Sequence, residues 1–210
     1  MQTEIAAFDP NQHDRFILQQ QFRLVVNQYE FLLPGPNDTP GQVICFVRQK
    51  MFKFKEDVRF FTDQSQTTLL MKIKARQRFD PRATYDVTDA NETKIGAFQK
   101  VFGKSLFRSS YRLFDAAGQE VATATELKLW VALFRRLIGF VPNIGNFANW
   151  LPIPYHFVFM RGERVLGHHK RQLWKFRDTY TLDLTLDADR TLDRRLVMAM
   201  AVALDAFQAR

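Results

Sequence analysis

Basic side chains occupy alternate positions in two segments of the chain. Arg48 and Lys50 are two residues apart, and Lys72, Lys74 and Arg76 follow the same spacing further on. Alternate residues of a β-strand project from one face, so each segment gathers its charges on one side. A basic stripe of this kind attracts the phosphates of lipid headgroups or nucleic acid. The alternative is a solvated outer face that serves solubility.

The charge of the whole chain is concentrated in the same region. The formal net charge is +8, and the stretch from Arg48 to Arg112 contains fifteen Lys and Arg against seven Asp and Glu. The remainder of the chain is balanced. Any electrostatic partner is therefore expected to meet this part of the protein.

Residues suited to nucleophilic catalysis are few. Cys45 is the only cysteine, which excludes an internal disulfide and any multi-cysteine metal site. A Cys-His pair would need His13, His156 or His169, and nothing in the sequence brings one of them to Cys45. Glycine-rich phosphate loops, Gly-x-Ser-x-Gly elbows and His-Glu-x-x-His motifs do not occur. We expect no enzymatic activity and no cofactor.

Two further groups of residues invite a metal site. His168 and His169 are adjacent on a predicted strand, where neighbouring side chains face opposite ways, so we interpret both as ordinary surface histidines. Asp187, Asp189 and Asp193 resemble a calcium cluster, but the segment has neither the glycine nor the distal Glu of a twelve-residue loop. Asp193 is expected to cap the helix that follows, and no metal site is predicted.

Four segments open on an aromatic residue and pass through a polar turn into a second alternating stretch. Their first residues are Phe60, Tyr85, Tyr111 and Tyr155, at spacings of 25, 26 and 44 residues. Each predicts a β-hairpin, with turns such as those at Asp63 and Asp115 started by an Asp side chain. The meander is expected to begin at Val43, after a preface of residues 1–41 whose segment 22–31 suits either a strand or a short helix.

The long fourth spacing indicates an insertion over residues 127–154. Apolar residues recur at helical spacing from Leu127 to Val141, which predicts an amphipathic helix of about four turns. Such a helix either packs on the sheet or lies in a membrane interface. The residues expected to contact a membrane or a partner are Trp130, Phe134, Arg135, Arg136, Phe147 and Trp150.

A second helix is predicted over residues 193–208. Leu196 to Leu204 form nine consecutive apolar residues between Arg195 and Asp205, and a helix that is apolar on every side is buried in protein. This run is shorter than the roughly 20 residues that span a bilayer. With 210 residues and no basic, apolar leader, the chain is expected to form one domain, residues 1–210, in the cytosol.

These elements together resemble the LURP-one-related proteins, relatives of the phospholipid scramblases and the tubby carboxy-terminal domain. The resemblance rests on residues 46–52, the successive Tyr-x-Val-x-Asp hairpins, Arg177 to Tyr180 and the helix ending Ala203-Leu204-Asp205. It implies a mainly β fold: a twelve-stranded antiparallel barrel threaded by the C-terminal helix, with Leu196 to Leu204 as its central plug.

Further matches are similar to the end of the scramblases. They are Val165-Leu166-Gly167, Gln172-Leu173-Trp174, the pair Asp187 and Asp189, and Leu192-Asp193. Only three residues separate Asp189 from Asp193, whereas scramblases have a longer stretch that is proposed to bind calcium. Tubby domains hold phosphoinositide headgroups with basic residues on neighbouring strands, and Lys72, Lys74 and Arg76 are their counterparts in kind.

The sequence therefore predicts a non-enzymatic protein that binds anionic phospholipid at the inner face of the membrane as a peripheral protein. Arg48, Lys50, Lys72, Lys74 and Arg76 are the expected headgroup ligands. The alternatives are a scramblase-like lipid transporter and a scaffold that docks a protein partner through its inserted helix over residues 127–141. Nucleic acid is not expected as a partner.

Overall fold

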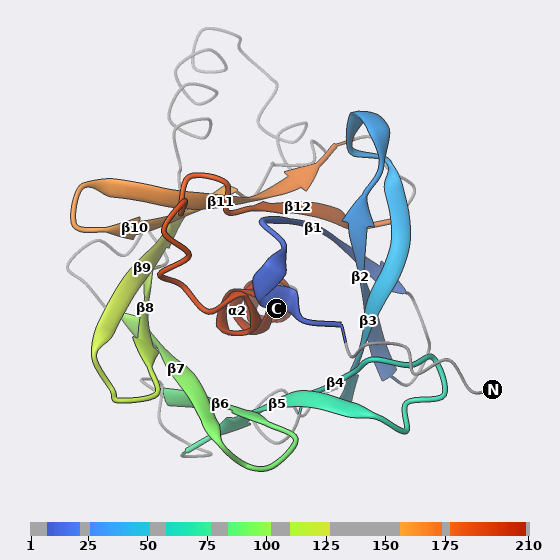
Figure 1. Ribbon diagram of the computed structural model, residues 1–210, viewed down its shortest axis with the longest axis horizontal. Coiled ribbons are helices and arrows are strands. Elements are labelled where there is room, and N and C mark those ends of the chain that lie inside the picture. The colour runs from blue at the N-terminus through green and yellow to red at the C-terminus, as the bar shows by residue number, and fades with distance from the viewer. Residues whose placement is uncertain are drawn as a thin grey trace, which may run out of the picture.

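The computed structural model describes residues 8–21, 26–50, 58–76, 84–101, 110–126, 156–173 and 177–208. Twelve antiparallel strands in these ranges close into a barrel around helix α2 (Figure 1). The strands are β1 (Arg15–Gln21), β2 (Val26–Pro34), β3 (Pro40–Lys50), β4 (Val58–Phe61), β5 (Leu69–Ala75), β6 (Thr84–Asp89), β7 (Lys94–Val101), β8 (Ser110–Asp115), β9 (Glu120–Glu126), β10 (His156–Arg161), β11 (Arg164–Gln172) and β12 (Thr179–Asp183). Two 3₁₀ turns, η1 (Pro10–Gln12) and η2 (Pro36–Asp38), and helix α2 (Arg194–Gln208) complete the described elements.

The four predicted hairpins are confirmed as β4–β5, β6–β7, β8–β9 and β10–β11. An Asp side chain organises the turn in the first three. Asp63 accepts the Thr67 N–H at 2.8 Å, and Asp115 accepts the Gln119 N–H at 2.8 Å. Asp89 accepts the Thr93 N–H at the same distance. An Asp carboxylate that binds its own backbone fixes where a turn starts, and here the device recurs with the period of the hairpins.

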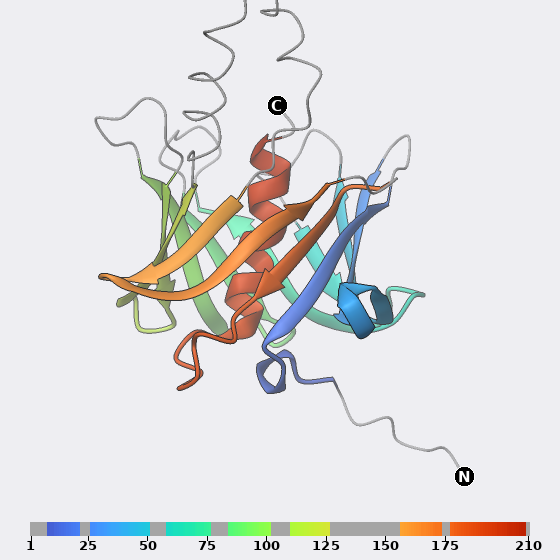
Figure 2. The same ribbon diagram turned by 90° about the horizontal axis from the view of Figure 1, so that it is seen from above.

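Helix α2 fills the centre of the barrel, as the family resemblance implies, and its predicted burial is confirmed. Every residue from Leu196 to Leu204 is at most 1% exposed. Figure 2 shows α2 along the barrel axis, beginning beside η1 and ending at the opposite mouth. The apolar inner faces of the strands surround it, so the barrel interior is a packed core rather than a channel.

The barrel begins earlier in the chain than the sequence pattern predicts. β1 and β2 lie within the predicted preface, and segment 22–31 contributes residues 26–31 to a strand. β1 closes the barrel against β12, where Phe16 lies opposite Leu182 and Leu18 opposite Tyr180. Residues 34–41, which are rich in Pro and Gly, connect β2 to β3 and carry η2.

One glycine shows how closely the helix fits. A Cβ atom at Gly96 in β7 would lie 2.4 Å from the Phe114 carbonyl oxygen and 3.0 Å from the Leu196 Cδ2. Real Cβ atoms do not approach backbone oxygen that closely, so only glycine suits this strand position. The first apolar residue of α2 thus packs directly on the wall. The predicted insertion, residues 127–154, lies outside the described residues.

Candidate anion-binding surface and polar clusters of the barrel

A row of basic residues crosses the outer wall of the barrel. Arg48 on β3 lies opposite Arg59 on β4, and Arg59 lies opposite Lys72 on β5. Lys72 in turn lies opposite Thr88 on β6, whose partner on β7 is Lys94. The inward neighbours Val47, Phe60 and Met71 are at most 1% exposed, so the cations project outward. We call Arg48, Arg59, Lys72 and Lys94 the basic row.

Lys74 and Arg76 extend the basic row toward one end of β5, and acidic residues neutralise part of it. The Arg76 guanidinium donates to both Asp86 oxygens at 2.7 Å, and these hydrogen bonds raise its pKa. Lys72 forms an ion pair with Glu92. Lys74 is exposed and lies opposite Asp86, whose two oxygens are already engaged by Arg76. The positive charge of the surface is thus reduced but not cancelled.

The sequence predicts that Arg48 lies on one face of its strand and that Lys72, Lys74 and Arg76 share a face, and in the structure these faces point outward. Sequence reasoning missed Arg59 and Lys94, because the row depends on the pairing between strands. The Asp63 turn was not a sufficient signal, because the register shifts between Phe60 and Phe61, and only this shift sets Arg59 beside Lys72. The Lys50 side chain lies outside the described part of the chain. So do the predicted contact residues Trp130, Phe134, Arg135, Arg136, Phe147 and Trp150.

The candidate nucleophile is enclosed. Cys45 is fully buried on β3, and its Sγ lies 3.9 Å from the Phe46 carbonyl oxygen. Burial in apolar surroundings raises the pKa of the thiol, which disfavours the reactive thiolate. His13 precedes β1, and its ring stacks on that of Phe8 with 5.1 Å between the ring centroids. Nothing in this geometry prepares Cys45 for attack.

The two adjacent histidines face opposite ways, as the strand alternation predicts, but only one is near the surface. His168 faces outward and lies 3.1 Å from His156, measured between Nδ1 and Nε2. His169 is 2% exposed, so its interpretation as a surface histidine was wrong. It packs inside the barrel, where its ring stacks on Tyr180 at 5.0 Å.

No described residue hydrogen-bonds either ring nitrogen of His169. Burial, followed by the charge of His156, lowers the pKa of His169 to about 3. The imidazole is therefore neutral at physiological pH and acts as an aromatic packing residue. Stacking on a tyrosine suits this role, because the charged form would lose its hydration without gaining a partner.

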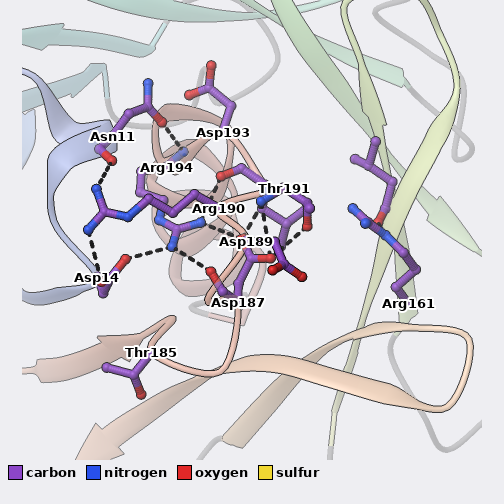
Figure 3. A network of polar contacts seen from close by, with 12 residues as sticks. Asn11, Asp14, Arg161, Thr185, Asp187, Asp189, Arg190, Thr191, Asp193 and Arg194 are labelled. Atoms are coloured by element: carbon purple, nitrogen blue, oxygen red, sulfur yellow. Dashed lines mark hydrogen bonds and ion pairs between the residues drawn. The ribbon is translucent and has the colours of Figure 1, made fainter.

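A polar cluster joins the beginning of α2 to the N-terminal residues (Figure 3). The side chain of Arg194 is fully buried and forms ion pairs with Asp187 and, at 2.7 Å, with Asp14. Asp187 also accepts N–H groups from Thr191 and Leu192. Burial opposes the charge of Asp187, but these hydrogen bonds prevail and lower its pKa. We call Asp14, Asp187 and Arg194 the lower cluster.

The remaining acidic residues of the calcium-like segment are also engaged. Asp193 accepts the Arg195 N–H at 2.9 Å, which confirms that it caps α2. Asp189 pairs with Arg164 at 3.1 Å. Within the described ranges, no group of three or more His, Cys, Asp or Glu side chains is placed to hold a metal ion.

A different polar cluster lies at the far end of α2. Asp205 is 5% exposed and accepts hydrogen bonds from two phenol hydroxyls, Tyr29 at 2.9 Å and Tyr180. Gln49 approaches the Tyr29 hydroxyl at 3.4 Å. Burial raises the pKa of Asp205, and the hydroxyl hydrogen bonds offset only part of that rise. We call Tyr29, Tyr180 and Asp205 the upper cluster.

The closed antiparallel barrel and the buried axial helix agree with the fold that the resemblance to the LURP-one-related proteins, which belong to the tubby-like and scramblase superfamily, implies. The LURP-one-related family model matches residues 43–205, and the chain belongs to that family. This family is generally non-catalytic. A search of curated proteins found no match. In the described ranges, no helix is both long and apolar enough to cross a bilayer.

Proposed function

We propose that this protein is a non-enzymatic, peripheral membrane protein that binds anionic phospholipid headgroups through the basic row. The single observation that carries the proposal is the direct opposition of Arg48, Arg59 and Lys72 on three neighbouring strands. Their side chains share one outer face, where a layer of headgroup phosphates can contact several of them at once. Lys74 and Lys94 widen the same surface.

The energetic argument comes from like charges in cross-strand pairs. Two cations directly opposite each other destabilise a sheet, because their side chains are only about 5 Å apart at the Cβ atoms. A row with two such pairs therefore contains repulsion between like charges. Phosphate groups would relieve this repulsion, so that the same arrangement favours an anionic surface.

The surrounding acids limit the attraction without abolishing it. Glu92 pairs with Lys72, and Asp86 pairs with Arg76. Both pairs are partly exposed and thus contribute little stability. Headgroup phosphates can therefore compete for these cations. Binding of this kind is reversible, and salt weakens it because ions screen exposed charges.

The direct test is vesicle flotation with the full chain. The variant Arg48→Gln, Arg59→Gln, Lys72→Gln is compared with wild type on phosphatidylcholine vesicles with and without phosphatidylserine. Attraction to an anionic leaflet contributes about 1 kcal/mol per basic residue, so affinity should fall about a hundredfold. The variant should also lose most of the salt dependence.

A charge-matched control removes three exposed arginines elsewhere on the barrel, with Arg112→Gln, Arg161→Gln and Arg164→Gln. It should retain most of the binding, because its charges lie on β8, β10 and β11. Equal losses in both variants would mean that net charge alone drives the association. Wild-type protein that ignores phosphatidylserine at low salt contradicts the proposal, and lipid flipping in the same vesicles would favour the transporter alternative.

A second contribution is expected from residues 127–154. Apolar insertion scales with buried area rather than with charge, so Trp130→Ala with Phe134→Ala should lower vesicle binding and keep its salt dependence. If that variant instead loses a protein partner and keeps its lipid binding, the segment acts as a docking element.

A further inference from the structure

A groove with a volume of about 760 Å³ lies on the outer face of β10, β11, β12 and β1. η2 forms one wall, because Arg15 on β1 pairs with both Asp38 of η2 and Asp183 of β12. β10 to β12 lie on the opposite side of the barrel from β4 to β6 (Figure 1). The groove is therefore separate from the basic row, with β2 between them on one side and β8 and β9 on the other.

The floor of the groove contains a row of polar side chains that lie opposite one another on neighbouring strands. His156 on β10 lies opposite Lys170 on β11, which lies opposite Thr181 on β12. His168 is the diagonal neighbour of His156, and their rings touch through the 3.1 Å contact between nitrogens. Four side chains that can donate hydrogen bonds thus converge on one hollow.

The charges of the groove are unequally compensated. Arg15 pairs with two carboxylates, Asp38 and Asp183, so these three residues carry a net negative charge, whereas Arg171 and Asp178 neutralise each other. Lys170 is exposed and has no acidic partner among the described residues. Its ammonium group is therefore available to an anion, and it balances the net charge of −1 carried by Arg15, Asp38 and Asp183 together.

The neutral groups point to the same ligand chemistry. The Thr181 hydroxyl accepts a hydrogen bond from the Gln172 amide at 2.8 Å, which leaves its own proton to donate. The imidazole pair is half-buried and holds at least one N–H beyond the nitrogen contact. A cation, a hydroxyl and imidazole donors together satisfy the several acceptor oxygens of a phosphate group.

We propose that this groove binds the phosphate group of a phosphate monoester, with Lys170 as the charged ligand and His156, His168 and Thr181 as hydrogen-bond donors. The site lies on a different wall from the proposed membrane surface and does not depend on it. The phosphate belongs to either a soluble ester or a lipid headgroup, since both present the same dianion.

Protonation of the histidine pair should strengthen the binding. The charged groups that face the pair among the described residues are Lys170, Asp183 and Arg15, and Arg15 already engages Asp183. Burial, the charge of His168 and that of Lys170 lower the pKa of His156. A bound dianion opposes these effects, because it favours the imidazolium form.

The experiment titrates the ¹⁵N-labelled full chain with glycerol 3-phosphate and inorganic sulfate and follows backbone and imidazole NMR signals. Shifts should centre on His156, His168, Lys170 and Thr181. Lys170→Gln should weaken binding at least fivefold, and Lys94→Gln, a matched lysine change in the basic row, should not. Sulfate stays dianionic, so tighter sulfate binding at pH 6 than at pH 7.5 isolates protonation of the histidines.

A second arm separates the two sources of phosphate. Vesicles with phosphatidic acid are tested against wild type and Lys170→Gln, with and without glycerol 3-phosphate as competitor. If glycerol 3-phosphate competes with the vesicles and Lys170→Gln binds them less, the groove binds a lipid headgroup. If the protein binds glycerol 3-phosphate but not the vesicles, the groove binds a soluble ligand. The proposal is overturned if neither probe shifts the groove, if chloride at equal ionic strength gives the same shifts, or if folded Lys170→Gln binds like wild type. If the triple variant Arg48→Gln, Arg59→Gln, Lys72→Gln loses vesicle binding and Lys170→Gln keeps it, the result concerns the proposed membrane surface and not the groove.

Discussion

The two ends of α2 hold buried charges in opposite ways. In the lower cluster, Arg194 is paired with two carboxylates, whereas in the upper cluster Asp205 meets only phenol hydroxyls and forms no ion pair among the described residues. Each charge also sits at the helix end that its sign disfavours, because the dipole is positive at the beginning and negative at the end. Local partners must therefore stabilise both.

Because of this difference, the contributions of the two clusters to stability should depend on pH in opposite ways. The carboxylates of the lower cluster have lowered pKa values, so their stabilising contribution is present above the unfolded value of 3.8 and is lost as pH falls. Asp205 has a raised pKa, so its contribution is complete below 3.8 and is lost as pH rises through the folded value. At neutral pH the lower cluster therefore stabilises the folded protein, whereas the buried carboxyl of the upper cluster destabilises it.

The largest effect is expected midway between the clusters. Met200 is fully buried and has no polar group to pair with a charge, so Met200→Asp should cost several kcal/mol. Against a total stability of about 5 to 15 kcal/mol, that loss threatens folding. Circular dichroism and urea unfolding measure it, with Met200→Leu as the control that keeps the volume. Cooperative, near-wild-type unfolding of Met200→Asp would contradict the buried axial helix.

In the lower cluster, Arg194→Met should destabilise the protein by about 3 to 5 kcal/mol, because it leaves Asp187 charged and buried without its cation. Arg190 is the control: it is 45% exposed and pairs with the same Asp14, so Arg190→Gln should cost no more than about 1 kcal/mol. Urea unfolding at pH 7 compares the two. Similar losses would show that burial of the pair does not matter.

In the upper cluster, Asp205→Asn should instead stabilise the protein at pH 7, by about 1 to 3 kcal/mol, because it removes a buried charge and keeps an acceptor for the tyrosines. Stability of the wild type should fall relative to the variant as pH rises above 3.8. Asp205→Leu serves as the control, since it orphans the Tyr29 and Tyr180 hydroxyls and should destabilise. An Asn variant less stable than wild type at pH 7 would mean that the carboxylate is paired after all.

The smallest effect at pH 7 is expected for His169→Phe, which keeps the stacking on Tyr180 and should change stability by no more than about 1 kcal/mol. Below the unfolded value of 6.5 the wild type must keep His169 neutral, down to its folded pKa of about 3. It should therefore lose roughly 1 kcal/mol per pH unit in this window. His169→Phe and His169→Gln should both lack that loss in urea unfolding at pH 5. If both variants lose stability with falling pH as the wild type does, His169 is in contact with water rather than buried.

Local patterns were sufficient for the four hairpins and for the burial of α2, whereas the closed barrel was implied by the family resemblance. Alternation, the Asp63 and Asp115 turns and the apolar run from Leu196 to Leu204 predict hairpins and a buried helix, because each acts within a few residues. β1 and β2 were less visible, since β1 has buried residues at three consecutive positions and lacks a clean alternation.

The upper and lower clusters could not be predicted from the sequence, because their residues are far apart along the chain. Arg194 meets Asp14 across 180 positions, and Tyr29 meets Asp205 across 176. Only closure of the barrel brings such residues together. His169 was misread because its environment depends on which face of β11 turns inward, and that is set by the pairing with β10 and β12.

The closed barrel also sets an order of events during synthesis. β1 pairs with β12, so the ring cannot close until β12 has left the ribosome, and α2 emerges last of the described elements. Until then the inward face of every strand lacks its main packing partner, and the long sequence separation of these contacts slows folding. The growing chain should therefore need chaperone protection until α2 arrives, and its release should complete folding in a single late step.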